Sequence, residues 1–337
     1  MATNTIRVQP AAMKDQFEKI LLAVGFPPGK ADTLARIFME NSLDGVYTHG
    51  VNRFPDFVDY VKKGHIRIDG EPECVHTFGS LEQWEGNLGP GVLNALRCAD
   101  RAMELARESG IGCVALANTN HWMRAGTYGW RVAKAGYIYI GWTNTIANMP
   151  PWGATKPRLG NNPIVIAVPY RDEAIVLDMA MSQYSIGALK QKKMRDELLP
   201  VPGGYDQQGN LSVDPSAILD SQRVLPIGYW KGAGLSLLLD IVATVLSGGL
   251  SVARITAQRA ERGLSQVFMA LSLERYSNRA LVDQIIQEIL TDYSSPAADA
   301  GQGPVLYPGE RVLKVRQENQ TGIPVMASVW NQILTLA

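Results

Sequence analysis

Between residues 74 and 182 the sequence breaks into short apolar runs, and this feature constrains the fold more than any other. The runs CVALANT, YIYIGWTNT, IVIAVP and IVLDMAMS are separated by glycine and proline. Runs of this kind are typical of strands. Helical stretches at about 91–109 and 126–136 alternate with the first strands. The pattern predicts an α/β fold in which helices cover a central mixed sheet.

Near the start of the chain the sequence follows a helical period instead. Phe17, Ile20, Leu21 and Val24 occupy positions i, i+3, i+4 and i+7, and a similar run starts at Leu34, with PPGK between the two. This spacing places the apolar side chains on one face of each helix. We therefore expect two amphipathic helices before the stretch VYTHGVNRF.

The second half of the chain is also mainly helical. The stretch GAGLSLLLDIVATVLSGGL at 232–250 is apolar on almost every side, which predicts a helix buried nearly all round. One strand near 266–275 follows it. Three further helices are predicted at about 277–292, 308–319 and 326–336.

These elements predict two structural units. We expect a helical portion built from both chain ends, 1–72 with 232–337, which also holds the strand near 266–275. The remaining residues, 73–231, form the central sheet domain.

Charge and cysteine content narrow the range of partners. The chain carries 32 Lys and Arg against 32 Asp and Glu, so it has no net field to attract nucleic acid or anionic membranes. A small molecule is therefore the expected partner. Cys74, Cys98 and Cys113 are widely spaced without a CxxC pair, which favours a reducing compartment over a disulfide framework or a zinc site.

Targeting signals are not visible in the sequence. The N-terminal stretch MATNTIRVQPAAMKDQFEKI lacks the apolar run of a signal peptide. The apolar stretch at 232–250 is short for a membrane span and is interrupted by Asp240. We expect a cytoplasmic protein without a membrane segment.

Standard nucleotide-binding motifs are also missing. No GxGxxG or P-loop pattern occurs, and EGNLGPG at 85–91 has the wrong spacing for a pyrophosphate-binding turn. If the protein binds a dinucleotide, it does so with a geometry other than the Rossmann fold.

Two of the four histidines lie in polar and aromatic stretches, each with an arginine shortly after it. His49, in VYTHGVNRF, has a near-neutral unperturbed pKa that suits proton donation, and Arg53 can grip a carboxylate through paired hydrogen bonds. His121, in NTNHWMR, follows a predicted strand, where α/β proteins gather ligands. A capping or surface histidine and a plain surface ion pair remain the alternatives. Neither HxxxH nor HExxH spacing occurs, so we expect no metal site and disfavour a metal-dependent hydrolase.

Two charged residues stand in apolar or glycine-rich surroundings. Asp178 lies inside the run IVLDMAM, where an unpaired carboxylate is costly, so an imidazolium, backbone amides or a ribose hydroxyl must satisfy it. A strand-end aspartate that caps the next turn is the alternative. Lys231, in GYWKGAGLS, precedes the apolar helix and brings positive charge to a helix N-terminus, which suits a phosphate. A tight turn alone would also explain the glycines there.

Together these stretches resemble a known family. GVYTHGVNRFP, NHWMRAGTYGW, WTNTIANMPPWGA, LPVPGGYDQQGN and LPIGYWKGAG, in this order, are similar to the malate/L-lactate/L-sulfolactate dehydrogenase type of NAD(P)-dependent oxidoreductases. The resemblance covers nearly the whole chain. It implies a non-Rossmann cofactor fold, with the cofactor in the 73–231 domain, and a homodimer that delivers hydride to the ketone beside a carboxylate.

The resemblance also implies residue roles. His49 falls on the family's proton donor, and Asp178 on the aspartate that supports the histidine or its water. The implied nucleotide contacts are Ala174, Ile175, Val176, Leu177, Asp178, Met179, Ala180, Trp230, Lys231, Gly309, Glu310 and Arg311.

The chain departs from the family pattern at three motifs, one of which is YPGERV, with Glu310 and Arg311 at positions where close relatives vary. Where SHG is usual it has THG, and the added methyl of Thr48 could crowd the substrate. NNP at 161–163 stands where TNP is common. These changes affect the choice of substrate and cofactor rather than the reaction class.

The expected mechanism follows from these residues. Arg53 holds the substrate carboxylate, His49 protonates the reduced oxygen while Asp178 orients its ring, and Thr48 and His121 frame the same cleft. A 2-oxo sugar acid is the expected substrate and NADH the expected cofactor. NADPH stays open, because Lys190, Lys192, Lys193 and Arg311 could each read a 2′-phosphate.

Other functions remain open. Oxidation of malate, lactate or ureidoglycolate, or reduction of a cyclic imino acid, would use the same groups. A nucleotide-binding protein without catalysis is the more distant alternative.

Overall fold

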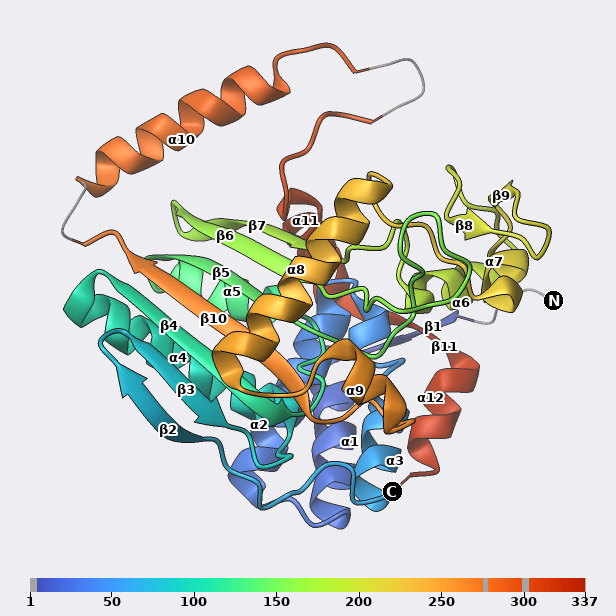
Figure 1. The fold of residues 1–337 in the computed structure, drawn as a ribbon, viewed down its shortest axis with the longest axis horizontal. Helices are drawn as coiled ribbons and strands as arrows, with labels where there is room; N and C mark the ends of the chain where they lie inside the picture. The colour runs from blue at the N-terminus through green and yellow to red at the C-terminus, as the bar shows by residue number, and fades with distance from the viewer. Residues whose placement is uncertain (1–4, 275–277, 299–302, 337) are drawn as a thin grey trace.

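A seven-stranded mixed sheet forms the centre of the computed structural model, which describes residues 5–274, 278–298 and 303–336 (Figure 1). The strand order is β2-β3-β4-β10-β5-β6-β7, in which β3 and β4 are parallel and the other neighbours antiparallel. The strands are β2 (Glu73–Phe78), β3 (Leu81–Glu85), β4 (Ile111–Thr119), β5 (Tyr137–Thr143), β6 (Ile164–Tyr170), β7 (Glu173–Met179) and β10 (Leu264–Ser272). The predicted mixed sheet is confirmed.

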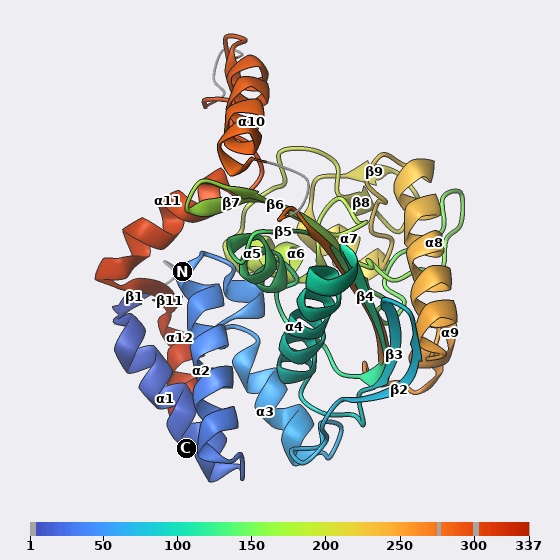
Figure 2. The ribbon, with the colours of Figure 1, turned by 90° about the vertical axis from the view of Figure 1, so that its left-hand side faces the viewer.

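Helices cover both faces of this sheet. Figure 2 views the sheet along its edge, with α4 (Gly91–Ser109) and α5 (Gly126–Lys134) on one side and α8 (Trp230–Ser247) and α9 (Val252–Ala257) on the other. Each side has its own apolar core. On the α4 and α5 side, Trp122, Tyr128 and Phe268 pack ring against ring, which fixes the chain segment after β4.

The helical portion is built from both chain ends, as predicted. It contains α1 (Pro10–Ala23), α2 (Pro28–Leu43), α3 (Phe54–Lys62) and α12 (Ala327–Leu334), joined by the strand pair β1 (Thr5–Val8) and β11 (Ile323–Met326). Phe17 of α1 and Phe54 of α3 stack in its core with ring centroids 4.1 Å apart. The short 3-10 turn η1 (Tyr47–His49) links α2 to α3 and carries the first histidine.

The second half of the chain differs from the sequence-based division. Residues 232–272 belong to the sheet layers, because α8 packs on β10, β4 and β5, and β10 lies between β4 and β5 at the centre of the sheet. The strand predicted near 266–275 is β10, although residue 275 lies outside the described residues.

The prediction that the apolar helix is buried nearly all round is wrong. One side of α8 packs on the sheet through small residues and Leu239, and Asp240 accepts a hydrogen bond from the Val252 amide at 3.0 Å. Its other side leaves seven large apolar side chains exposed, Trp230, Leu235, Leu237, Leu238, Ile241, Val242 and Val245. Among the described residues α8 is the one helix with the length and apolar composition of a membrane span.

Three further segments complete the chain. The excursion after β7 has a small core of its own and contains α6 (Ile186–Met194), β8 (Gly204–Tyr205), β9 (Leu211–Ser212) and α7 (Pro215–Ser221). Both ribbon views show α10 (Arg279–Ser294) projecting from the body of the molecule (Figures 1 and 2). Residue 277, where this helix was predicted to begin, lies outside the described residues. The chain then returns through α11 (Glu310–Glu318) and the short turn η2 (Asn319–Thr321) to β11.

Candidate active site

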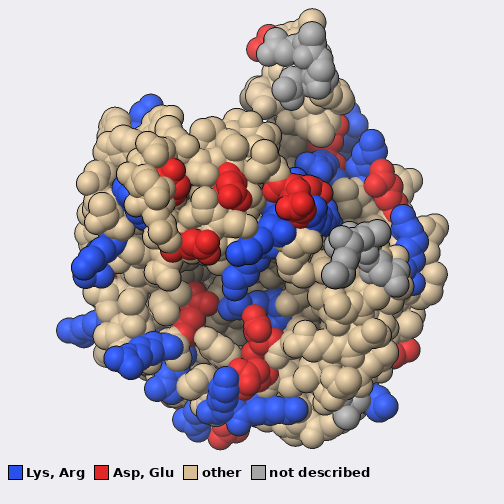
Figure 3. Space-filling model, turned by 90° about the vertical axis from the view of Figure 1, so that its right-hand side faces the viewer, with Lys and Arg blue, Asp and Glu red and all other residues tan. Residues whose placement is uncertain are grey.

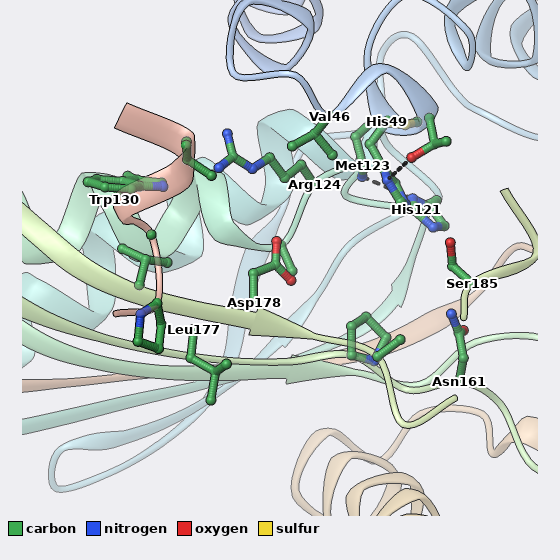
Figure 4. Close-up of a pocket in the computed structure, with 18 of the residues that line it drawn as sticks. Val46, His49, His121, Met123, Arg124, Trp130, Asn161, Leu177, Asp178 and Ser185 are labelled. Atoms are coloured by element: carbon green, nitrogen blue, oxygen red, sulfur yellow. Dashed lines mark hydrogen bonds between the residues drawn. The ribbon is translucent and has the colours of Figure 1, made fainter. Parts of the chain in front are cut away.

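A cavity of about 430 Å³ lies where the helical portion, the sheet and the start of α6 meet. Figure 4 shows that its lining divides into two ends. His49, His121, Ser185 and Asn161 lie at one end, and Trp130 and Leu177 lie toward the other. The full lining is Val46, Thr48, His49, His121, Met123, Arg124, Ala125, Trp130, Thr145, Asn161, Pro163, Val176, Leu177, Asp178, Ala180, Ser185, Pro308, Gly309 and Val312.

The loop that carries His49 is held closely against α2. The Asn41 side-chain amide donates to the His49 carbonyl at 3.0 Å, and the Val51 amide donates to Ser42 Oγ at 2.8 Å. A Cβ at Gly50 would lie 2.2 Å from Ser42 Oγ, so this contact requires glycine. The THG motif therefore fixes the direction in which the imidazole leaves the backbone.

His121 enters the same end of the cavity from the segment after β4. The Met123 amide donates to His121 Nδ1 at 2.9 Å, so a neutral His121 carries its proton on Nε2. The two imidazole rings stack, with centroids 5.8 Å apart and planes inclined by 21°. The sequence-based expectation that the two histidines frame one cleft agrees with this placement.

Both imidazoles are neutral in this cavity. Burial lowers the pKa of His49 to about 3, a proton on the neighbouring His121 would lower it further, and the charge of Arg53 acts in the same direction. Burial also lowers the pKa of His121 to about 3, with Arg53 again adding to the effect. Because these values describe the cavity without an anionic ligand, a bound carboxylate would shift both pKa values upward.

Asp178 faces the middle of the cavity from the end of β7 (Figure 4). Its Oδ2 accepts a hydrogen bond from the Gly126 amide at 2.7 Å, at the N-terminus of α5. Although the side chain is open to the cavity, the surrounding protein raises its pKa, and Arg124 and the Gly126 amide partly oppose this rise. Of the partners expected for Asp178, the described residues supply a backbone amide.

Asp178 does not orient His49 in this structure. Within the described part of the chain its hydrogen-bond partner is Gly126, while the nearest polar partner of His49 Nδ1 is Thr48 Oγ1 at 3.1 Å. Thr48 lines the cavity, and its methyl carbon contacts α6, because a Cβ at Gly187 would lie 3.2 Å from the Thr48 Cβ and from this methyl carbon. The methyl group expected to crowd the substrate thus lies against the first turn of α6.

Arg53 lies outside the main cavity. It lines a small neighbouring cavity that shares His121 and Met123 with the main one. Its guanidinium binds Asp56 at 3.1 Å and Glu261 at 3.4 Å. The charge of Arg53 therefore lowers the pKa of both imidazoles, while its side chain stays paired with the carboxylates of Asp56 and Glu261.

Arg124 lines the cavity, although the sequence analysis assigned it no role. Its side chain is 5% exposed and binds Asp44, which also binds Arg316 of α11 through contacts of 2.6 and 2.9 Å. The two guanidiniums hold the pKa of Asp44 below its usual range despite its burial. This chain of buried charges joins α2, the segment after β4, and α11 around the cavity.

The other end of the cavity has features that fit a nicotinamide nucleotide. The Val176 amide donates to the Pro308 carbonyl at 3.0 Å, which brings β7 and the start of α11 together. Gly309 has φ +97°, and a Cβ there would lie 3.1 Å from the Val176 amide nitrogen. Trp130 is 6% exposed, and its buried indole nitrogen has no hydrogen-bond partner among the described residues. The close backbone approach and the free donor suit a ligand with many acceptor atoms.

The structure brings together only part of the predicted nucleotide contacts. Val176, Leu177, Asp178, Ala180 and Gly309 line the cavity. The other predicted contacts do not line the cavity. Ala174, Ile175 and Met179 lie elsewhere on β7, and Trp230 and Lys231 lie at the start of α8. In α11, Glu310 accepts a hydrogen bond from the Tyr307 amide, and Arg311 is exposed. Trp230 is 64% exposed, and within this chain it does not reach the cavity.

One face of the molecule carries charges of both signs (Figure 3). The face in Figure 3 is hollowed near its centre, and Lys and Arg side chains lie beside Asp and Glu along the hollow. Within the cavity lining itself, Arg124 is the one Lys or Arg among the described residues, and it is already paired with Asp44. The cavity wall therefore offers no unpaired basic side chain for an additional phosphate.

Comparison with known proteins reveals relatives over nearly the whole chain. The sequence model of the malate/L-lactate dehydrogenase family matches residues 8–334. A 2,3-diketo-L-gulonate reductase from Citrobacter koseri is 43% identical over 327 residues, which cover 96% of this chain and 98% of that protein.

Solved structures show the same fold. Malate dehydrogenase from Pyrococcus horikoshii superposes with a TM-score of 0.89 at 25% identity, covering 99% of this chain and 95% of that one. Malate dehydrogenase from Entamoeba histolytica gives a TM-score of 0.94 at 23% identity, covering 99% of this chain and 97% of that one.

Proposed function

Because the chain belongs to the malate/L-lactate dehydrogenase family and is an oxidoreductase with a nicotinamide cofactor, we propose that it reduces 2,3-diketo-L-gulonate to 3-keto-L-gulonate. The observation that carries the proposal is the near full-length identity of 43% to proteins named for this reaction. The two neutral histidines beside a polar cavity end support it.

The nucleotide end of the cavity would hold the cofactor. Val176, Leu177 and Gly309 would contact it, and the Trp130 indole would donate to it. The bound cofactor supplies the hydride to the substrate's carbonyl carbon. Asp178 would contact the cofactor from the middle of the cavity, with its carboxylate anchored by Gly126.

His49 would supply the proton to the reduced oxygen. A neutral imidazole is a poor acid, so the proton must enter with the substrate, whose negative charge raises the pKa of His49. His121, stacked on His49 and carrying a proton on Nε2, would donate a hydrogen bond to the developing negative charge.

Arg53 would orient the substrate carboxylate. Its guanidinium has five N–H donors, and its contacts to Asp56 and Glu261 use only some of them. A shift of the guanidinium from Glu261 toward the substrate would bring positive charge to the histidine end. Replacing Arg53 with Ala should therefore raise KM for the acid more than it lowers kcat.

We propose NADH as the cofactor. A 2′-phosphate is recognised by a basic side chain, and Arg124, the one such group in the described cavity lining, is occupied by Asp44. KM for NADH should therefore be lower than KM for NADPH.

We also propose a homodimer in the cytoplasm. The exposed apolar face of α8 supports a second copy of the chain as its partner. Trp230 and Lys231, at the start of the same helix, could then contact the cofactor of the partner subunit.

The decisive experiment measures the loss of nicotinamide absorbance with a panel of 2-oxo acids. Rapid oxidation of NADH with 2,3-diketo-L-gulonate supports the proposal. Preference for pyruvate, oxaloacetate or a cyclic imino acid would keep the family and identify a different substrate. Cofactor binding without turnover on the whole panel would contradict catalysis.

A further inference from the structure

The polar end of the cavity contains two side chains that the reaction itself does not require. Asn161 and Ser185 line it opposite the histidines, from the segment before β6 and the start of α6. In Figure 4 the amide of Asn161 points toward Ser185, and the Ser185 hydroxyl points toward His121.

The orientation of the Asn161 amide is set by its neighbours. Its Oδ1 accepts hydrogen bonds from Thr145 Oγ1 at 3.1 Å and from the Asn148 side-chain amide at 3.3 Å. An amide whose oxygen is occupied in this way turns its nitrogen outward. The Asn161 nitrogen, with two N–H donors, therefore faces the cavity.

The Ser185 hydroxyl also has hydrogen-bonding capacity that the protein does not occupy. Its Oγ accepts from the Ala188 amide at 3.1 Å and caps α6, which leaves its own hydrogen free to donate. A hydroxyl with one accepted bond can still accept another. Ser185 can therefore both donate to and accept from a ligand hydroxyl.

We propose that Asn161 and Ser185 form a subsite for the hydroxyl groups of the substrate's carbon chain. The inference rests on the proposed function and names the residues that select a polyhydroxylated acid over a short one. Uncharged donors suit hydroxyls, whereas a second carboxylate would call for a cation. When a hydroxyl is missing, donors in a cavity lose their partner, and the shorter acid binds less well.

The test compares a hydroxylated acid with a short acid. L-gulonate and L-lactate are titrated into the NADH-loaded enzyme, where neither can be reduced, so binding is measured without turnover. The Asn161→Ala substitution should raise Kd for L-gulonate about tenfold, the effect of one lost hydrogen bond, and leave Kd for L-lactate unchanged. Asn210→Ala is the matched control, since it removes an exposed side-chain amide that bonds to Asp206 and does not line the cavity.

Ser185→Ala is measured in the same way. Because this change also removes a helix cap, Asp214→Ala, which uncaps α7 in the same excursion, controls for lost helix stability. The Ser185 variant should weaken L-gulonate binding, and the Asp214 variant should not.

The outcomes separate this inference from the proposed reaction. An equal loss for both acids, or no loss for L-gulonate, overturns the subsite. Equal affinity of the unaltered enzyme for the two acids overturns it as well. If NADH is not oxidised with 2,3-diketo-L-gulonate while the binding differences hold, the reaction is wrong and the subsite stands.

Discussion

At the scale of single residues, the proposed reaction depends most on His49 as its proton donor. A His49→Ala substitution should lower kcat by roughly 10²-fold or more, the usual contribution of a general acid. Binding of NADH, measured by titration, should persist because His49 lies at the opposite end of the cavity from Trp130. His76→Ala, on the exposed strand β2, serves as the control. Turnover near the parent value in the His49 variant would remove this histidine from the mechanism.

The pH dependence of reduction tests the low pKa of the same imidazole. Because the free enzyme holds His49 at a pKa of about 3, the protonated fraction falls tenfold for each unit of rising pH near neutrality. For a reaction that needs this proton, kcat/KM should fall steadily as pH rises from 5 to 8 on the order of tenfold per unit. The kcat profile, which reports the substrate complex, should break at a higher pH. A flat kcat/KM profile over this range would show that the proton comes from another source.

The sequence located some site residues and missed others for identifiable reasons. His49 and His121 stood out because histidines are few and both lie in loops after predicted elements. Arg124 lies in the same HWMR stretch, but its partner Asp44 is far away in the sequence, so its burial had no local signal. Asp178 was identified from its apolar surroundings, yet the Gly126 amide that satisfies it became visible only in the fold.

At the scale of elements, the contact between η1 and α2 positions the loop that carries His49. Gly50→Ala would force a Cβ to 2.2 Å from Ser42 Oγ and 2.8 Å from the Ser42 amide nitrogen. The substitution should lower the free energy of unfolding by about 1–3 kcal/mol, the usual cost of overpacking, and reduce kcat by moving His49. Denaturant titration and a turnover assay measure the two effects.

Gly29→Ala is the matched control for that experiment. Gly29 lies in the first turn of α2, and an added Cβ there meets no atom within 4 Å. Alanine should stabilise the helix by about 0.5 kcal/mol and leave turnover unchanged. If both glycine variants behave alike, close packing at Gly50 does not position the loop.

The positions of helices and strands along the chain were more predictable than their burial and pairing. The predicted helix at 91–109 and the strands β4 to β7 agree with the structure. The helical pattern persists over many residues, and clear turn residues flank the strands. The exposed face of α8 was mistaken for core, because a sequence pattern cannot distinguish burial within one chain from burial against a partner. The pair β1 and β11 went unnoticed, since two four-residue strands at opposite ends of the chain carry almost no local signal.

At the scale of the whole molecule, the α8 face predicts the oligomeric state. A Leu238→Glu and Val245→Glu double variant places two charges on this face and should convert a dimer to monomers in analytical ultracentrifugation. If Trp230 and Lys231 complete the partner's cofactor site, the monomer should also lose turnover. Leu22→Glu, at an exposed position of α1, is the control. A monomeric parent protein would contradict the proposal.

Acid should destabilise the whole fold through the two neutral imidazoles. Their pKa values are about 3 in the folded protein and 6.5 in the unfolded chain, so between these values the unfolded chain binds more protons. Their contribution to stability is therefore complete above pH 6.5 and is lost as the pH falls toward 3. A variant with both histidines replaced by glutamine should show a shallower decrease in unfolding free energy over this range. An unchanged slope in denaturant titrations would mean that other groups control acid unfolding.

The central position of β10 has a consequence for synthesis on the ribosome. Strands β4 and β5 are neighbours in sequence, yet β10 separates them, and β10 ends only at Ser272. A nascent chain that has released both earlier strands must therefore keep them apart, or unpaired, until more than a hundred further residues have emerged. Premature pairing of β4 with β5 would close the gap that β10 must enter. The emerging chain should accordingly be a substrate for chaperones that bind exposed strands, and a chain halted before Ser272 should be unable to complete the sheet.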